Sequence, residues 1–233
     1  REEFPALDLT LRGAISIGRR LQDPLSESVK IEPKSIGVGQ YQHDVDQRLL
    51  GKELEHTVSS CVNFVGVDLN TAGYSLLQYV SGINKRIAKN IVEYRSKNGM
   101  FKNRNEILEV SGLGNKTFEQ CAGFLRISNS ENPLDNSAVH PENYKLVSNI
   151  AEKLNMDIKD LLRNERILNS VKVEEFISDN IGVYTLKDII EELKKPGRDP
   201  RANFQNPNFR DDLNSIKNLQ TGMILEGVVT NLT

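Results

Sequence analysis

Two short glycine-bearing phrases in this sequence have the residue types that bind a phosphate group. The first, "VSGINKR", begins at Val80, and the second, "VSGLGNK", begins at Val110. Glycine adopts left-handed backbone angles without the steric cost of a Cβ atom, and it allows a ligand to approach the main chain closely. A tight glycine turn that opens a helix directs several unpaired N–H groups the same way, which favours an anion. The repeat therefore predicts two backbone phosphate sites.

Each predicted site consists of turn residues and the cations that follow them. They are Gly82, Ile83, Asn84, Lys85, Arg86 and Lys89 in the first copy, and Gly112, Leu113, Gly114, Asn115 and Lys116 in the second. Contacts to phosphates carry no base sequence information, so binding is expected to be sequence-independent. The first copy has Asn84 where the second has Gly114. Asparagine tolerates left-handed angles better than most residues, so we expect the same turn there with a weaker phosphate site.

Short helices must hold these turns in place. The apolar spacing predicts a long helix from about residue 48 to a stop at Gly66, then helices at about 72–80, 85–97, 103–109 and 115–125. Asn70 or Thr71 is expected to cap the first of the four short helices. No alternating strand pattern occurs here, so this unit is predicted to be entirely α-helical. Two helices joined by a tight glycine turn resemble the helix-hairpin-helix motif.

The flanking segments are also mainly helical in pattern. A helix with an apolar face of Leu11, Ala14, Ile15 and Leu21 is expected to stop at Pro24, and short extended pieces are expected around Pro33. Residues 142–195 predict further short helices, with Pro141 in the first turn of the first one. Residues 194–209 predict a loop, and residues 223–230 a strand. The predicted fold class is mainly α, with a truncated β element at the C-terminus.

The charge distribution is more informative than the net charge of −2. Residues 58–128 hold nine cations and five anions, a net charge of +4, whereas residues 129–195 hold nine cations and thirteen anions, a net charge of −4. The only basic segment is therefore the one with the repeated phrase. No apolar run long enough to cross a membrane occurs. Cys61 and Cys121 are expected to be buried free thiols, which is typical of the cytoplasm.

Catalytic and metal-binding patterns are weak. His43, His56 and His140 have no partner at a metal-ligand spacing, so no metal or other cofactor is predicted. Asp44 and Asp46, beside His43, could hold Mg²⁺ in a nuclease, but a solvated loop is the favoured interpretation. No nucleophile triad, phosphate loop or dinucleotide fingerprint occurs. We expect no enzymatic activity.

Several longer phrases resemble the bacterial Tex proteins, which are transcription accessory factors that bind nucleic acid. The phrases are "SIGVGQYQHDV", "CVNFVGVDLNTAGYSLLQYVSGI", "FEQCAGFLRI", "NPLDNSAVHPENY" and "LKKPGRDPR". The resemblance implies that the chain is part of a longer protein and that it contains four segments. These would be residues 1–47, the end of a ribonuclease H-like (YqgF-type) domain; 48–130, a tandem helix-hairpin-helix domain; 131–205, a second helical hairpin-type domain; and 206–233, a linker and the first strand of an OB-fold RNA-binding domain.

This resemblance implies a nucleic-acid-binding role in the cytoplasm, on RNA or DNA, and leaves two alternatives open. One is a structure-specific nuclease or resolvase, an activity suggested by the neighbouring ribonuclease H-like domain. The other is a helical scaffold that docks on RNA polymerase or the ribosome, for which the acidic segment 129–195 would suit a protein partner.

Overall fold

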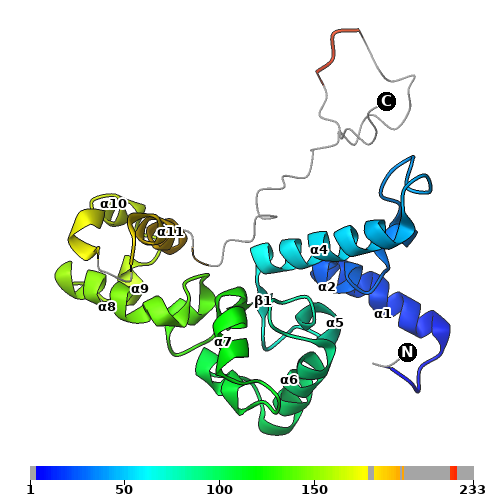
Figure 1. The fold of residues 1–233 in the computed structure, drawn as a ribbon, viewed down its shortest axis with the longest axis horizontal. Helices are drawn as coiled ribbons and strands as arrows, with labels where there is room; N and C mark the ends of the chain where they lie inside the picture. Colours follow the sequence, from blue (N-terminus) through cyan, green and yellow to red (C-terminus); the bar gives the residue numbers. More distant parts are fainter. Residues whose placement is uncertain (1–3, 178–180, 195, 197–220, 225–233) are drawn as a thin grey trace. The chain divides into compact units, whose positions relative to one another are not determined.

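The computed structural model describes residues 4–177, 181–194, 196 and 221–224 (Figure 1). The chain divides into two units, Arg1–Arg198 and Asp199–Thr233. Most of the second unit, including the predicted strand from residue 225 onward, lies outside the described residues. The described part of the first unit is mainly α-helical, as expected.

The N-terminal part of the unit consists of α1 (Leu9–Gln22), α2 (Pro24–Ser28), α3 (Pro33–Ile36) and the long α4 (Gln47–Val65). The predicted stop before Pro24 is confirmed, because Asp23 ends α1 and its side chain caps α2 through the Ser26 N–H at 3.1 Å. The extended segment expected around Pro33 is wrong. Proline fixes an angle suited to a first helical turn, and a short helix forms there.

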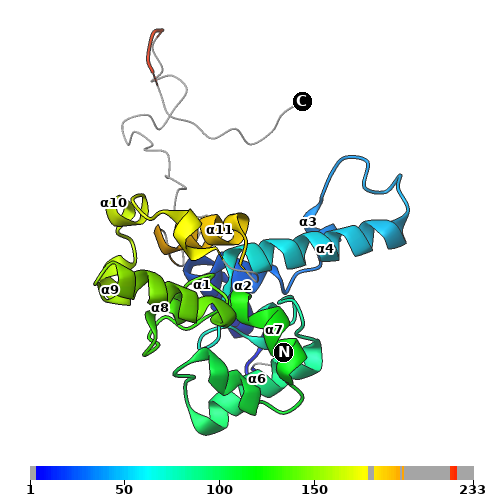
Figure 2. The ribbon, with the colours of Figure 1, turned by 60° about the vertical axis from the view of Figure 1, so that its left-hand side comes forward.

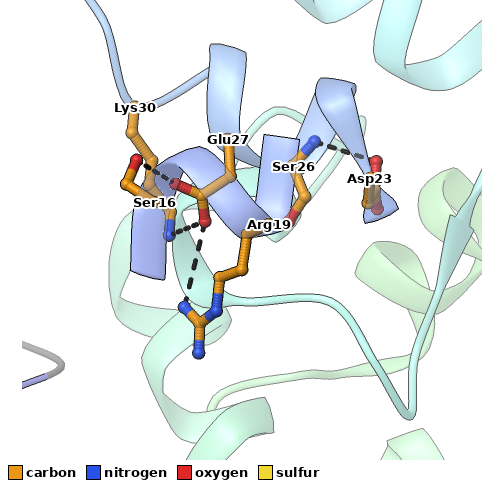
Figure 3. Close-up of polar contacts among 6 residues, drawn as sticks. All are labelled: Ser16, Arg19, Asp23, Ser26, Glu27 and Lys30. Atoms are coloured by element: carbon orange, nitrogen blue, oxygen red, sulfur yellow. Dashed lines mark hydrogen bonds and ion pairs between the residues drawn. The ribbon is translucent and has the colours of Figure 1, made fainter. Parts of the chain in front are cut away.

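The apolar face predicted for α1 lies largely in solvent. Leu11 is 51% exposed and Leu21 is 89% exposed, and α1 contains no buried residue. A buried carboxylate joins α1 to α2 instead (Figure 3). Glu27 accepts hydrogen bonds from Ser16 Oγ at 2.9 Å and Lys30 Nζ at 2.6 Å. The apolar spacing correctly predicted one apolar face on α1, but it could not show whether other residues of the chain pack against that face.

The central hairpin unit contains α5 (Tyr74–Leu77), α6 (Lys85–Asn98), the 3₁₀ helix η1 (Arg104–Glu109), α7 (Asn115–Cys121) and η2 (Ala122–Phe124). The prediction of an entirely helical unit is wrong in one detail. β1 (Val67–Asp68) pairs in parallel with β2 (Leu125–Arg126), which ties the two ends of the unit together. Two-residue strands are too short to give a period-two pattern.

One apolar core holds this hairpin unit together. It includes Leu69, Leu77, Ile91, Phe101 and Ile107, with Leu25 and Val29 from the N-terminal part packed against it. Figure 2 gives a second view of α6 and α7 around this core. Residues 24–29 are therefore anchored on the hairpin unit by apolar packing.

The second helical region contains η3 (Pro133–Asn136), η4 (Pro141–Asn143), α8 (Tyr144–Lys153), α9 (Ile158–Leu161), α10 (Glu165–Leu168), η5 (Val173–Phe176) and α11 (Val183–Lys194). A separate core forms here, including Leu146, Val147, Ile150, Leu186 and Leu193. The short helices predicted for residues 142–195 are confirmed, and α8 and α11 contribute to this core. Pro141 begins the short helix that leads directly into α8, as expected.

A buried arginine links the two cores. Arg104, at 1% exposure, donates to the carbonyl of Val139 at 2.6 Å, to the carbonyl of Ser137 and to the hydroxyl of Tyr144 at 2.9 Å. The Tyr144 hydroxyl in turn donates to Asp135 at 2.6 Å. Burial lowers the pKa of Arg104. The guanidinium thus satisfies three oxygen acceptors of the second region from within η1.

Candidate nucleic-acid interface

The two repeated phrases form turns with the same geometry. Gly82 and Gly112 both lie in the left-handed region, with φ angles of 79° and 85°. The apolar residues that follow, Ile83 and Leu113, are buried. Their N–H groups donate within the turn, to Val80 O at 3.0 Å and to Val110 O at 3.1 Å. In both copies the two residues before and the three after the buried position are exposed. Each turn is therefore anchored by one buried side chain, and its other residues are exposed to solvent.

The two turns pack against each other's second helix. A Cβ atom on Gly82 would lie 2.9 Å from Gln120 Cβ of α7, and a Cβ atom on Gly112 would lie 3.9 Å from Asn90 Nδ2 of α6. Asn90 also donates to the Ser111 carbonyl at 2.7 Å. Since Asn90 and Gln120 occupy equivalent positions of the repeat, the two copies are related by an approximate two-fold symmetry.

Asn84 and Gly114 differ from the expectation. Neither is left-handed: their φ angles are −91° and −99°, both extended. Asn84 is the N-cap of α6, and its Oδ1 accepts from the Ile87 N–H at 3.0 Å. The role of asparagine at position 84 is therefore to cap α6. Its tolerance of left-handed backbone angles, on which our expectation rested, has no role. Gly114 caps α7 without a side chain, and a Cβ atom on it would meet open space.

Several N–H groups at the turns have no protein partner among the described residues. In the first copy they belong to Asn84, Lys85 and Arg86. Such groups are the unsatisfied donors at a helix start, and they carry the positive end of the helix dipole. The N–H groups of Ile83 and Leu113, which we included in the predicted sites, are already engaged inside their turns.

The predicted cations lie beside these donors. Lys85, Arg86 and Lys116 are exposed, and none forms an ion pair with a described residue. Lys89 lies over the ring of Tyr74, with 5.2 Å between its Nζ and the ring centroid. A shallow surface depression is lined by Lys85, Arg86, Lys89 and Asn90. The first copy thus concentrates positive charge, whereas the second has Lys116 alone.

Residues outside the repeat position the first turn, and sequence analysis missed them. Asn63 of α4 accepts from the Ser81 N–H at 3.1 Å, and Ser59 Oγ donates to the Tyr79 carbonyl at 2.8 Å. Both contacts join positions about twenty residues apart. A polar residue every four positions on α4 was the available signal.

The cap predicted at Asn70 or Thr71 is wrong. Asp68 accepts from the N–H groups of both residues, at 2.8 Å and 3.2 Å. The Asn70 side chain instead pairs with the backbone of Phe101, as donor at 2.9 Å and as acceptor at 2.8 Å. The N-cap of α5 is Gly73, which has no side chain, so no side-chain oxygen caps this helix.

The other candidate residues have ordinary structural positions. Asp46, considered as a metal ligand, caps α4 by accepting from Arg48 and Leu49 N–H groups at 2.8 Å and 2.9 Å. Within the described ranges no cluster of three or more His, Cys, Asp or Glu side chains could hold a metal ion. None of the helices in those ranges combines the length and apolarity needed to cross a membrane.

One of the two cysteine predictions is wrong. Cys121 is buried, and burial raises the pKa of its thiol to about 12. Cys61 is exposed on α4. Val62 is the one residue of this helix that is fully buried.

Comparison with known proteins matches these features. Residues 62–126 match the helix-hairpin-helix motif family, and residues 132–201 match a second helix-hairpin-helix domain family. Over 232 residues the chain is 56% identical to protein YhgF of Escherichia coli, covering all of this chain and 30% of that protein. It is 54% identical over 230 residues to the transcriptional accessory protein Tex of Neisseria gonorrhoeae, covering 99% of this chain and 30% of that one.

A more distant relative is the human S1 RNA-binding domain-containing protein 1, which is 37% identical over 288 aligned positions, with all of this chain and 29% of that protein covered. The chain thus spans about 30% of the length of the curated relatives that it matches. Identity to the two bacterial relatives exceeds half of the aligned positions, so over essentially its whole length the chain is similar to a segment of the Tex proteins.

Proposed function

We propose that this chain binds the phosphate backbone of RNA or DNA through its two hairpin turns, as part of a Tex-like transcription accessory protein. One observation carries the proposal. Two turns with the same left-handed glycine and the same exposure pattern present unpaired N–H groups and cations at equivalent positions. Donors of this kind hold a phosphate by geometry, and neighbouring cations add the long-range attraction.

Binding of this type has no base contacts and is sequence-independent. The charge of the region supports it, since residues 58–128 carry a net charge of +4 from nine cations and five anions. The names of two relatives, a transcriptional accessory protein and an S1 RNA-binding domain-containing protein, agree with a nucleic-acid partner.

A charge-reversal experiment tests the proposal. Changing Lys85, Arg86, Lys89 and Lys116 to Glu should weaken binding of a short duplex severalfold or more, measured by fluorescence anisotropy. A matched control reverses the same number of charges on exposed positions of the second helical region, at Lys145, Lys159, Arg166 and Lys187. Equal binding by both variants would contradict the proposal.

We propose further that the chain binds nucleic acid without cleaving it. Asp46, one of the two carboxylates that a metal-dependent nuclease could use, is occupied as the cap of α4. Incubation of the protein with labelled branched DNA and Mg²⁺ tests this part. Products that depend on both protein and Mg²⁺ would overturn it.

A second candidate function, docking on a protein of the transcription or translation machinery, has one observation in its favour. Residues 129–195 carry a net charge of −4, from nine cations and thirteen anions, which disfavours nucleic acid. In this case the second helical region would bind a basic surface of RNA polymerase or the ribosome. Pull-down with purified polymerase, with and without the control charge reversals above, distinguishes the two roles.

A further inference from the structure

A cleft beside the first hairpin has four cations among its twelve lining residues. It has a volume of about 460 Å³ and is formed by α1, α2, α5 and Lys85, the first residue of α6. Ligand pockets that hold small molecules are typically about 300–1,000 Å³ in volume. The cleft can therefore accept one or two nucleotides but not a duplex.

The charges that line the cleft are strongly unbalanced. The cations are Arg12, Arg19, Lys30 and Lys85, and Glu27 is the one carboxylate among the lining residues. Glu27 is 4% exposed and is already bound by Ser16 and Lys30, with Arg19 at 3.9 Å (Figure 3). This carboxylate fixes two cations at the wall of the cleft and cannot neutralise the other two.

Arg12 and Lys85 are the two cations that Glu27 leaves unmatched. Arg12 Nε donates to the Asp8 carbonyl at 3.3 Å, which does not neutralise its charge. Neither Arg12 nor Lys85 has a carboxylate within ion-pair distance in the described part of the chain. A site of this kind favours an anion, because an arginine fork binds phosphate oxygens in pairs.

The remaining walls are partly apolar and aromatic. Phe4 and Tyr74 line the cleft together with Ile15 and Val29. Tyr74 is partly buried against the core of the hairpin unit and has Lys89 over its ring at 5.2 Å. Arg19 lies over the Phe4 ring at 5.1 Å. Aromatic rings next to cations form the usual platform for unpaired bases, which stack without regard to sequence.

We propose that this cleft binds a single-stranded segment of nucleic acid that continues from the duplex or strand held by the first hairpin. The proposal rests on the proposed function, because Lys85 belongs to both the hairpin and the cleft. Arg12 and Lys85 contact phosphates, and Tyr74 or Phe4 stacks on a base. The chain would then prefer a junction between paired and unpaired nucleic acid to a blunt duplex.

The test compares a short blunt duplex with the same duplex carrying a single-stranded oligothymidine extension, both on the full chain. Wild-type protein should bind the extended probe more tightly. Arg12→Gln should remove much of this advantage and reduce the salt slope on the extended probe by about 0.7, the value for one single-strand phosphate contact. Its affinity for the blunt duplex should stay unchanged, and Arg12→Lys should keep part of the advantage.

Arg20→Gln is the matched control, since Arg20 is an exposed arginine of the same helix that does not line the cleft. Circular dichroism checks that both variants are folded. An unchanged extension advantage in Arg12→Gln, or an equal loss on both probes, would overturn the cleft proposal. Wild-type protein that fails to bind the blunt duplex would instead overturn the hairpin proposal, and the extension strand alone would still test the cleft.

Discussion

Gly82 and Gly114 both belong to the repeated turn, but they are glycine for different reasons. Gly82 has a φ angle of 79° and lies against Gln120 of α7, so the fold itself excludes a side chain. Gly114 has an ordinary extended φ angle of −99°, and a Cβ atom there meets open space. Nothing in the fold requires glycine at that position. Two physical reasons remain: glycine is a better N-cap than alanine, and it allows a ligand to approach the main chain closely.

This contrast predicts opposite behaviour for two alanine variants. Gly82→Ala should destabilise the protein by about 1–2 kcal/mol or more, from left-handed strain together with the contact at Gln120. Gly114→Ala should cost at most about 1 kcal/mol, because alanine is a poorer N-cap than glycine, but it should weaken duplex binding. Urea denaturation and fluorescence anisotropy measure the two effects. Full duplex affinity in folded Gly114→Ala would show that the second turn does not contact the backbone of the nucleic acid.

The two cysteines should differ in reactivity. The thiolate is the reactive form, and the Cys121 thiol, with its pKa raised to about 12, stays protonated throughout the neutral range. We expect a thiol reagent such as DTNB to modify one thiol quickly at pH 8 and the second only on unfolding. Cys61→Ser should remove the fast phase, and Cys121→Ser should leave it. Two fast phases in the folded protein would contradict the burial of Cys121.

At the scale of elements, η1 carries the joint between the two cores. Arg104 donates to two carbonyl oxygens and one hydroxyl of the second helical region. Its charge is desolvated, so these partners must remain in place. The joint is therefore a buried polar network, in which the Tyr144 hydroxyl passes the contact on to Asp135.

Arg104→Ala should destabilise the protein by roughly 3 kcal/mol or more, because it leaves the buried carbonyls of Val139 and Ser137 and the Tyr144 hydroxyl without their donor. The urea midpoint, followed by circular dichroism, should fall accordingly. Arg166→Ala is the control, since Arg166 is an exposed arginine of α10. A similar midpoint for both variants would mean that the two helical regions are held together without this network.

The elements that sequence analysis predicted well were those with a local signal. The repeated phrase located both turns, and the 3.6-residue spacing located α4, α6, α8 and α11. What it missed depends on distant partners. The β1–β2 pair joins residues 58 apart in the sequence, and Arg104 finds acceptors more than thirty residues away. An arginine in a polar phrase gives no indication that it will be buried.

The candidate site could likewise be predicted only in part from the sequence. The glycines and cations follow from the pattern, but the difference between Asn84 and Gly114 does not. Both residues are compatible with a tight turn, and only the observed angles show that each is a helix cap. Cys61 is a related case: it lies next to the fully buried Val62 on α4, but it is exposed itself.

At the scale of the whole molecule, the net charge of −2 conceals a basic hairpin region and an acidic second region of equal magnitude. Nucleic-acid affinity should therefore come from a few local contacts and not from the general field of the protein. If the two turns together contact about three phosphates of a duplex, log K should fall with log salt with a slope near −3. Arg86→Gln and Lys116→Gln should each lower that slope by about 0.9, whereas Lys159→Gln should leave it unchanged. An equal change for all three variants would mean that the overall electrostatic field of the protein dominates binding. That result would contradict the proposal that the two turns bind phosphates.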